Sequence, residues 1–426
     1  MLFRQFVDDD LGCGSYLVGD SSAGEAVVVD PAFAIEQYLE AADREGVRIT
    51  RVLETHTHAD HLSGHGRFAL EHELPVAIHP LARPEYPFEP LADGDTLHVG
   101  DVEVRVLHTP GHRPEHCAFV VDDELVLTGD SLFVGDAARP DLAIDAREGA
   151  ADLYRSVRRL AELADAVVVY PGHVSGSLCG TNMSDEHSTS IGRERQTNHA
   201  LRAKLAEFVE ESASLTTPKP PTTERLVALN RGPWVGALPP LQELDASNRL
   251  LLAQNVVLDV RPIDMFAAGH LPGAISVALD GGSFATRAAF VLDPAEPVVL
   301  HAGSRAEADE AARLLRAVGL FEQLGFIRGD GSERLQTLSV PELARLDGNA
   351  QVLDVREESE EPRTDWLVIP YRLLRISPPP DLDPSRPVYT ICASGARATL
   401  AASLLARQGF DARPVVGGGV ADLADR

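Results

Sequence analysis

The chain has 426 residues, and a length of this order predicts about two or three domains. Its hydrophobic fraction of 44% is enough for ordinary packed cores. The formal net charge of −27 argues against nucleic acid and against an anionic membrane surface as partners.

The N-terminal residues 1–6 run directly into an acidic stretch at 8–10, and no apolar run approaches the length of a membrane span. We therefore expect no signal peptide, no membrane segment and a cytoplasmic location. The four cysteines form no Cys-x-x-Cys pair. In such a chain they are expected to be thiols rather than a disulfide framework.

Potential metal ligands are densest in residues 55–61, which read Thr-His-Thr-His-Ala-Asp-His. The segment follows the apolar run 51–54, and a strand ending there would place the ligands on one loop at the C-terminal edge of a sheet. The candidates are His56, His58, Asp60 and His61. Imidazoles and carboxylates suit zinc or iron. The alternative is a polar surface loop, but chance produces such a string in only about one chain in a thousand of this size.

Three later strand ends also carry a potential ligand. His112, Asp130 and His173 each follow a glycine, after apolar runs at 102–107, 125–127 and 167–169. Glycine permits the sharp turn that aims the next side chain inward. One such signal is weak, since a His or Asp after Gly usually marks only a turn. Four strand ends in one order, within about 120 residues, predict a metal site.

The order H-x-H-x-D-H, G-H, G-D and G-H resembles the metallo-β-lactamase superfamily. The resemblance covers residues 1 to about 240 and implies an αββα sandwich with metal bound at one edge. Strings at 12–19, 55–61 and 127–133 resemble the persulfide dioxygenase branch. In that branch two histidines and one aspartate hold one ferrous iron and leave open positions for O₂ and substrate. Here the resemblance implies His56, His112 and Asp130 as the iron ligands.

The other candidate ligands keep two interpretations. In the dioxygenase branch they would orient the iron ligands. In the hydrolase branches all seven residues bind two zinc ions, so the ligand inventory leaves Fe(II), one per chain, and Zn(II) open. These other candidates are His58, Asp60, His61 and His173.

Some further residues bear on the substrate. Arg139 lies in a segment that resembles the Gly-Arg-x-Asp of family members, which implies help in binding glutathione; the alternative is a surface arginine. Members that use glutathione carry Tyr-His-Gly a few residues after the histidine that corresponds to His173. Residues 174–176 here read Val-Ser-Gly, so coenzyme A or another bacterial thiol stays open as the carrier. Cys179 is either an accessory thiol near the metal or structural, and Cys13 is expected to be a buried strand-end residue.

The second half of the chain contains a repeat. The string Val-Leu-Asp-Val-Arg at 257–261 recurs at 352–356. Each repeat alternates short apolar strands with Ala/Leu-rich helices, which predicts small α/β units with parallel sheets. Linkers are expected at 216–223 and 329–332. We therefore predict domains at residues 1–245, 246–332 and 336–426.

The second repeat carries a reactive-cysteine pattern. Cys392 stands between an apolar strand at 388–391 and a helix through 398–407, where backbone N–H groups and the helix macrodipole favour a thiolate. Arg397 adds positive charge near the sulfur. This Cys-x-x-Gly-x-Arg pattern resembles rhodanese (sulfurtransferase) domains, in which the cysteine carries persulfide sulfur. The alternative is a buried structural cysteine.

The first repeat is expected to be an inactive rhodanese-like spacer or docking domain. It has family-like segments at 259–261 and 269–274, but Ala302 stands about where the cysteine belongs. His301 as a catalyst is the weaker alternative. The second repeat in turn lacks the Gly-His-x-Pro-Gly-Ala string found at 269–274.

Together the resemblances imply a persulfide dioxygenase that uses O₂ to oxidise a low-molecular-weight thiol persulfide to sulfite. Rhodanese sulfur transfer at Cys392 would then produce or use thiosulfate, and one chain would keep the product of one site near the other. Two alternatives stay open: a dinuclear zinc hydrolase of the glyoxalase II or lactonase kind, and a non-enzymatic sulfur carrier. A homodimer or higher homo-oligomer is expected.

Overall fold

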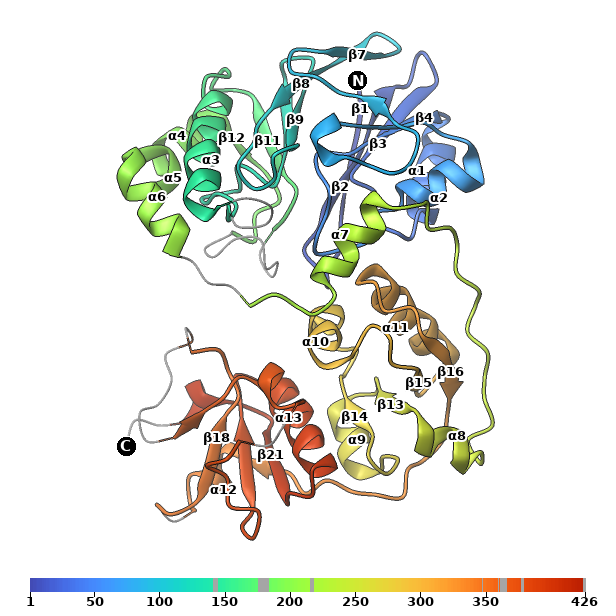
Figure 1. Cartoon of the computed structure of the whole chain (residues 1–426), viewed down its shortest axis with the longest axis vertical. Helices are drawn as coiled ribbons and strands as arrows, with labels where there is room; N and C mark the ends of the chain where they lie inside the picture. Colours follow the sequence, from blue (N-terminus) through green and yellow to red (C-terminus); the bar gives the residue numbers. More distant parts are fainter. Residues whose placement is uncertain are drawn as a thin grey trace. The chain divides into compact units, whose positions relative to one another are not determined.

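The computed structural model describes residues 1–140, 145–174, 184–214, 218–346, 348–358, 360, 366–376 and 379–423. The chain divides into two compact units. One is formed by Met1–Leu238 with Arg316–Gly319, and the other by Pro239–Leu315 with Leu320–Arg426. Helices and strands are mixed in both units (Figure 1), as the predicted α/β class requires.

The first unit contains a sheet of strand order β1-β2-β3-β4-β5-β6 and a sheet of order β12-β11-β10-β9-β8-β7. The strands of the former are β1 (Leu2–Val7), β2 (Gly14–Asp20), β3 (Glu25–Val29), β4 (Arg48–Leu53), β5 (Val76–Ile78) and β6 (Glu89–Pro90). Those of the latter are β7 (Thr96–Val99), β8 (Val102–His108), β9 (Cys117–Val121), β10 (Leu125–Gly129), β11 (Val168–Pro171) and β12 (Thr189–Ser190). Strands β9 and β10 are buried along their whole length, as expected of apolar strands covered on both faces.

The helices of this unit include those that cover the outer faces of the two sheets. They are α1 (Glu36–Glu45), α2 (His65–His72), α3 (Ala146–Leu160), α4 (Ile191–Thr197), α5 (His199–Arg202), α6 (Leu205–Ser214) and α7 (Thr223–Arg231), with the 3-10 turn η1 (Pro80–Ala82). One apolar cluster joins the facing sides of the sheets, a second joins the β1–β6 sheet to α1 and α2, and a third joins the other sheet to α3. Two sheets between two helical layers confirm the predicted αββα sandwich.

Helix α3 shows how local sequence fixes one of these outer layers. Asp145 precedes the helix, and its carboxylate accepts hydrogen bonds from the N–H groups of Arg147 and Glu148. Arg158 and Arg159 stand in the last turn, where positive charge complements the helix dipole. Leu153 lies on the buried face. The helix therefore has a fixed start and packs directly on the loop that follows β8.

The second unit contains two further sheets built from parallel strand pairs. One has the order β14-β13-β15-β16, from β13 (Val256–Asp259), β14 (Ile275–Ser276), β15 (Val298–His301) and β16 (Gln323–Ile327). The other has the order β17-β21-β20-β18-β19, from β17 (Leu338–Ser339), β18 (Gln351–Asp354), β19 (Leu367–Val368), β20 (Val388–Ile391) and β21 (Ala412–Val416). The helices are α8 (Arg249–Gln254), α9 (Ile263–Ala268), α10 (Phe284–Val291), α11 (Arg305–Ala317), α12 (Val340–Leu343) and α13 (Ala396–Arg407), with the 3-10 turns η2 (Tyr371–Leu373) and η3 (Val420–Asp422).

The two sheets repeat one topology. Strands β14, β13, β15 and β16 of one correspond in order to β19, β18, β20 and β21 of the other. Both first central strands end in the same buried ion pair, Asp259 with Arg261 at 2.6 Å and Asp354 with Arg356 at 2.8 Å. The repeat seen in the sequence is therefore a structural repeat. The predicted boundaries of the three domains stay a prediction.

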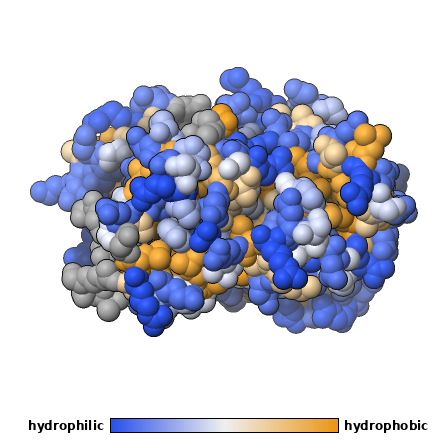
Figure 2. Space-filling view, turned by 90° about the horizontal axis from the view of Figure 1, so that it is seen from below, coloured by the Kyte–Doolittle hydropathy of each residue, from blue (hydrophilic) through white to orange (hydrophobic). Residues whose placement is uncertain are grey.

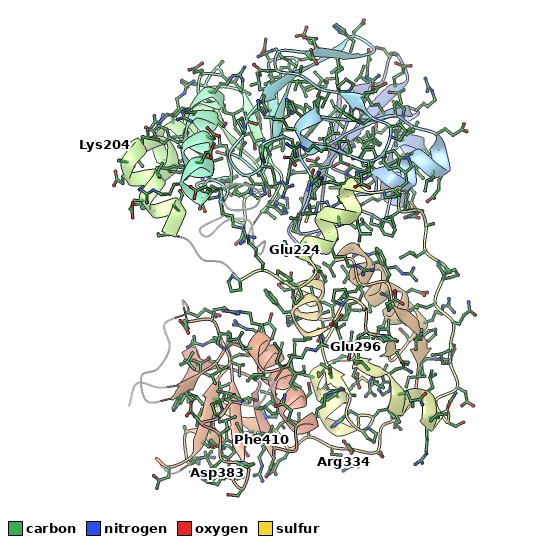
Figure 3. All side chains as sticks on the ribbon, in the orientation of Figure 1. Lys204, Glu224, Glu296, Arg334, Asp383 and Phe410 are labelled. Carbon is green, nitrogen blue, oxygen red and sulfur yellow. The ribbon has the colours of Figure 1, made fainter. Side chains whose placement is uncertain are left out.

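Within this unit the repeats contact each other. Ser276 N–H donates to Ser403 Oγ at 3.1 Å, and Glu296 (Figure 3) pairs with Arg375.

On the face drawn in Figure 2, hydrophilic side chains surround smaller apolar areas. The large exposed apolar residues of the unit are Leu250, Met265, Leu324, Leu373 and Ile376. None of the helices in the described part of the chain is both long and apolar enough to cross a membrane.

We predict that Gly111→Ala destabilises the first unit by about 1–3 kcal/mol, because a Cβ there would stand 2.4 Å from the Leu153 Cα of α3. The loop that carries His112 would have to move. Gly94→Ala is the matched control, since Gly94 also has a positive φ, of 83°, but has nothing within 4 Å. Thermal unfolding of both variants measures the difference. Equal losses would show that backbone strain alone matters at Gly111.

Candidate metal centre and sulfur site

The predicted ligands of the first unit meet at one edge of the sandwich. His56, His58, Asp60 and His61 follow β4, and His112, Asp130 and His173 follow β8, β10 and β11. All except the partly exposed Asp60 are buried. The strand ends seen in the sequence thus bring the candidate side chains together. Their ligand atoms separate into distinct groups rather than one shared cluster.

The first group is His56, His112 and Asp130. Asp130 Oδ2 lies 3.5 Å from His112 Nε2 and 4.0 Å from His56 Nε2. This buried oxygen has no hydrogen-bond donor within the described part of the chain. A buried, unsatisfied carboxylate oxygen facing two imidazole nitrogens is the arrangement expected around a cation. The three side chains therefore fit a metal ion.

Hydrogen bonds to the Nδ1 atoms orient the two histidines of this group. His56 Nδ1 lies 2.8 Å from Thr55 Oγ1, which donates to Asp30. His112 Nδ1 donates to the carbonyl of Arg139 at 2.8 Å. Such contacts fix the tautomer and leave Nε2 directed at the metal position.

Charge in the first group also suits a metal. Burial lowers the pKa of His112 and, with the neighbouring His58, holds the pKa of His56 well below its ordinary value, so both imidazoles are neutral. Burial acts to raise the pKa of Asp130, but His173 outweighs it and lowers that pKa, so the carboxylate is ionised. Neutral nitrogen donors and one anionic oxygen are the forms that bind a divalent cation.

His58 belongs to a separate buried group. Its Nε2 lies 3.2 Å from both Asp30 Oδ1 and Glu54 Oε2. Burial alone would lower its pKa, but these carboxylates hold the pKa of His58 well above its ordinary value. Neither ring nitrogen of His58 has a hydrogen-bond partner in the described part of the chain, and His58, Asp30 and Glu54 form a group of their own that could hold a metal ion.

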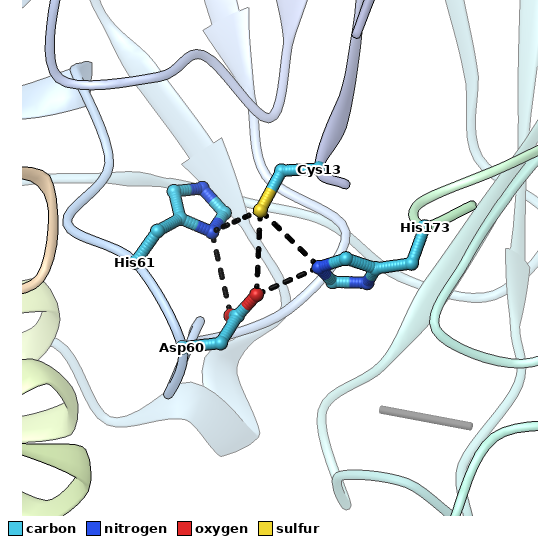
Figure 4. Close-up of side chains that lie close together, drawn as sticks. All are labelled: Cys13, Asp60, His61 and His173. Carbon is cyan, nitrogen blue, oxygen red and sulfur yellow. Dashed lines mark hydrogen bonds and ion pairs between the residues drawn. The ribbon is translucent and has the colours of Figure 1, made fainter. Parts of the chain in front are cut away.

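A third group forms around Cys13 (Figure 4). The Cys13 Sγ lies 3.4 Å from Asp60 Oδ2, 3.5 Å from His61 Nδ1 and 3.3 Å from His173 Nε2. Burial, followed by the Asp60 carboxylate, raises the pKa of the Cys13 thiol well above its ordinary value. His173 joins the first and third groups, because its Nδ1 lies 2.7 Å from Asp130 Oδ1 and its Nε2 2.6 Å from Asp60 Oδ2.

The sequence did not identify Cys13 as part of this group. It predicted a buried strand-end residue, and Cys13 is indeed buried directly before β2. Its partner His173 is 160 residues away and forms an isolated β-bridge with it. Only the sheet topology brings the two strands together, so no local pattern could have revealed the contact.

His116 was also missed. Its Nε2 accepts from the Asp130 N–H at 2.9 Å, and its Nδ1 lies 2.8 Å from Thr109 Oγ1. Burial lowers the pKa of His116 to about 3, which keeps Nε2 free to accept. His116 lies four residues after His112 without a glycine before it, so the strand-end rule did not select it.

Asn230 on α7 fixes the loop after β4. Its amide nitrogen donates to the carbonyls of His58 at 2.9 Å and His61 at 2.8 Å, and its oxygen accepts from the Ser63 N–H at 2.9 Å. The side chain is 2% exposed. A helix some 170 residues from the loop in sequence thus sets the position of several candidate ligands.

Arg139 is buried, whereas its alternative interpretation was a surface arginine. Its carbonyl binds His112, which places it beside the first group. Cys179 and the Asp141 of the Gly-Arg-x-Asp comparison lie outside the described residues.

Cys392 lies in the second unit between β20 and α13. Its Sγ is buried and accepts a hydrogen bond from the Gly395 N–H at 3.1 Å. Gly395 has a φ of 106°, which a side chain would strain, so the glycine permits the turn that aims this N–H at the sulfur. Arg397 in the first turn of α13 pairs through both nitrogens with Glu360, a partner that the sequence did not predict.

In the first repeat the position that corresponds to Cys392 has no reactive side chain. Ala302 follows β15 and is buried. His301 Nδ1 lies 3.0 Å from Asp259 Oδ2, and its Nε2 donates to the Gly329 carbonyl at 2.8 Å. The hydrogen bond of Nε2 and the nearby Asp259 carboxylate favour a structural role for His301.

Family models match two parts of the chain: the metallo-beta-lactamase superfamily at residues 8–173 and the rhodanese-like domain at 243–331. The persulfide dioxygenase ETHE1 of Bos taurus is 30% identical over 237 residues, which cover 54% of this chain and 87% of that protein. The hydroxyacylglutathione hydrolase of Rhizobium etli is 36% identical over 166 residues, covering 37% of this chain and 60% of that one.

Among solved structures, a metallo-beta-lactamase from Staphylococcus aureus matches with a TM-score of 0.70 and 28% identity, covering 77% of this chain and 99% of that one. The chain belongs to the metallo-beta-lactamase superfamily and carries a rhodanese-like domain. The rhodanese-like match falls on the repeat with Ala302, whereas Cys392 lies in the repeat that shares its topology.

We predict that Asn230→Ala weakens metal binding by about 10–100-fold, as loss of an orienting contact does in other metal sites. Asn198→Ala is the control, because Asn198 is equally buried and donates to the Asp136 carbonyl and to Glu194, away from the loop after β4. Chelator competition with Fe(II) and Co(II) measures the affinity. The same loss in both variants would mean that Asn230 acts only through general stability.

Proposed function

We propose that the first unit is a mononuclear iron persulfide dioxygenase and that Cys392 is the sulfur carrier of a coupled rhodanese reaction. The observation that carries the proposal is the separation of His58 from His56, His112 and Asp130. Two histidines and one carboxylate with open positions are typical of non-haem iron oxygenases. A hydrolase of the dinuclear kind would need His58 as a ligand, and its Nε2 lies instead 3.2 Å from Asp30 Oδ1 and Glu54 Oε2.

The residues would divide the work as follows. His56, His112 and Asp130 would hold one Fe(II) ion, which would supply the redox chemistry between O₂ and the persulfide. His173 and His116 orient Asp130 through its Oδ1 and its backbone N–H.

The overall reaction balances. A persulfide anion R–S–S⁻, O₂ and water give sulfite, the free thiol R–SH and one proton: the S–S bond breaks, the outer sulfur is oxidised and O₂ is reduced. At the second site the Cys392 thiolate would take the outer sulfur of another persulfide and release its thiol. Sulfite would then remove that sulfur as thiosulfate and restore the thiolate, and the reverse direction is equally balanced.

Relatives support the proposal in part. The Bos taurus relative is a persulfide dioxygenase, and its similarity covers the first unit only. The persulfide would be that of glutathione, coenzyme A or another bacterial thiol, and Arg139, beside the metal group, is the proposed contact for it. We further propose a cytoplasmic homodimer or higher homo-oligomer.

A dinuclear zinc hydrolase is the second candidate. It is favoured by the Rhizobium etli relative and by the group of Asp60, His61 and His173, which could hold a second ion. Such an enzyme would use a metal-bound hydroxide on a thioester or lactone. It differs from the first candidate in requiring Asp60 as a ligand.

The direct test is O₂ uptake by iron-loaded protein given glutathione persulfide and, separately, coenzyme A persulfide. We expect uptake with thiosulfate as the product of the wild type and sulfite as the product of Cys392→Ser. No uptake with either persulfide, together with thioester or lactone hydrolysis by zinc-loaded protein, would contradict the dioxygenase and support the hydrolase.

Paired carboxylate variants test the iron ligands themselves. We expect Asp130→Asn to lose most of its iron, because it removes the anionic ligand, and Asp60→Asn to retain close to one iron per chain. Plasma emission spectrometry after anaerobic reconstitution gives both values. Loss of iron from Asp60→Asn, or retention by Asp130→Asn, would contradict the ligand assignment.

A further inference from the structure

We propose that Glu360 is a specificity-determining residue of the Cys392 site: its carboxylate occupies Arg397 as an internal counter-ion that an anionic sulfur substrate must displace. The inference rests on the proposed sulfur transfer at Cys392. Thiosulfate and sulfite are the anions concerned. Their oxygens offer a guanidinium the same kind of contact as a carboxylate does.

Hydrogen bonds to the Glu357 backbone hold the Glu360 carboxylate in place independently of Arg397. Glu360 N–H donates to the Glu357 carbonyl at 3.0 Å, and Glu360 Oε1 accepts from the Glu357 N–H at 3.1 Å. Arg397 then donates to both oxygens, with Nη2 2.9 Å from Oε2. A two-point contact from a preset carboxylate satisfies the face of the guanidinium that an anion would otherwise bind.

Arg397 is placed to serve the sulfur site. It stands in the first turn of α13, two residues after the Gly395 whose N–H binds the Cys392 sulfur. An anion bound to Arg397 would therefore lie beside the reactive sulfur.

The Glu360–Arg397 ion pair is more exposed to solvent than the Asp354–Arg356 ion pair of the same repeat. The Glu360 and Arg397 side chains are 34% and 24% exposed, whereas those of Asp354 and Arg356 are 0% and 11% exposed. An incoming anion can replace a carboxylate that already borders solvent, since water compensates the displaced charge. The Asp354 pair has no such route.

The inactive repeat supplies an internal comparison. The Asp354–Arg356 pair recurs there as Asp259–Arg261, so that pair belongs to the common fold. Aligned on these pairs, Met265 stands where Glu360 stands in the second repeat. In that register no acidic residue occupies the position of Glu360, although Asp264 stands directly before Met265.

The Glu360 group is charged at neutral pH. Burial acts to raise its pKa, but the hydrogen bonds and charge of Arg397 outweigh burial and lower the pKa below its ordinary value. Replacing Glu360 with glutamine would remove the negative charge and keep the shape. The guanidinium would then meet an incoming anion without an ionic competitor.

The test measures anion binding without turnover. Sulfite, which has no sulfane sulfur to transfer, should protect Cys392 from alkylation by iodoacetamide, and the concentration for half protection should fall about two- to fivefold in Glu360→Gln. In sulfur transfer from thiosulfate to cyanide, KM should fall with kcat unchanged within about twofold. Asp411→Asn is the control, because Asp411 also pairs with an arginine, Arg413 at 2.6 Å, at the start of β21. It should leave both quantities unchanged.

The outcomes separate the possible failures. In an Arg397→Ala background, Glu360→Gln should have no further effect. A higher half-protection concentration or a lower kcat in Glu360→Gln would overturn the inference and make Glu360 a positioning residue for Arg397. Equal protection in wild type and Glu360→Gln would overturn the inference alone. No protection of the wild type by sulfite, together with no sulfur transfer from thiosulfate to cyanide, would overturn both the inference and the proposed sulfur transfer.

Discussion

The first unit depends on one buried charge, the carboxylate of Asp130. Its Oδ1 meets His173, its Oδ2 faces His56 and His112, and its backbone N–H binds His116. An ionised group in such a place is costly unless it is paired. The ends of β4, β8, β10 and β11 supply those partners, so the αββα sandwich can be understood as the frame that compensates this charge. A divalent cation between Oδ2 and the two imidazoles would complete the compensation.

The second unit also contains buried charges, and each of its two repeats pairs them in the same way. Each repeat buries an Asp–Arg pair at the end of its first central strand, and each has the same order of parallel strands. The loops after the third of these strands then diverge. One ends in Ala302, with His301 tied to Asp259, and the other presents Cys392 to a backbone N–H and to a helix N-terminus. The two repeats thus share one frame and differ in this loop.

The sequence predicted the sandwich, the parallel repeats and the strands that precede the candidate ligands, because each depends on local apolar patterns and glycine turns. It also predicted that the candidate histidines and aspartates lie at one edge of the sandwich, as they do. It did not predict how they divide into groups, nor the contacts of Cys13, His116 and Asn230. Those contacts join segments through the tertiary fold, and the Glu360–Arg397 pair does the same across 37 residues. Side-chain pairing of this kind has no period that a sequence can reveal.

The most direct test of the account is anomalous diffraction at the iron and zinc edges from crystals of the protein loaded with each metal. The account predicts one iron peak within about 2.0–2.2 Å of the Nε2 atoms of His56 and His112 and of an Asp130 oxygen, with His58 still paired to Asp30 and Glu54. Two peaks about 3.5–4 Å apart, with His58 and Asp60 among the ligands, would contradict it and establish a dinuclear centre.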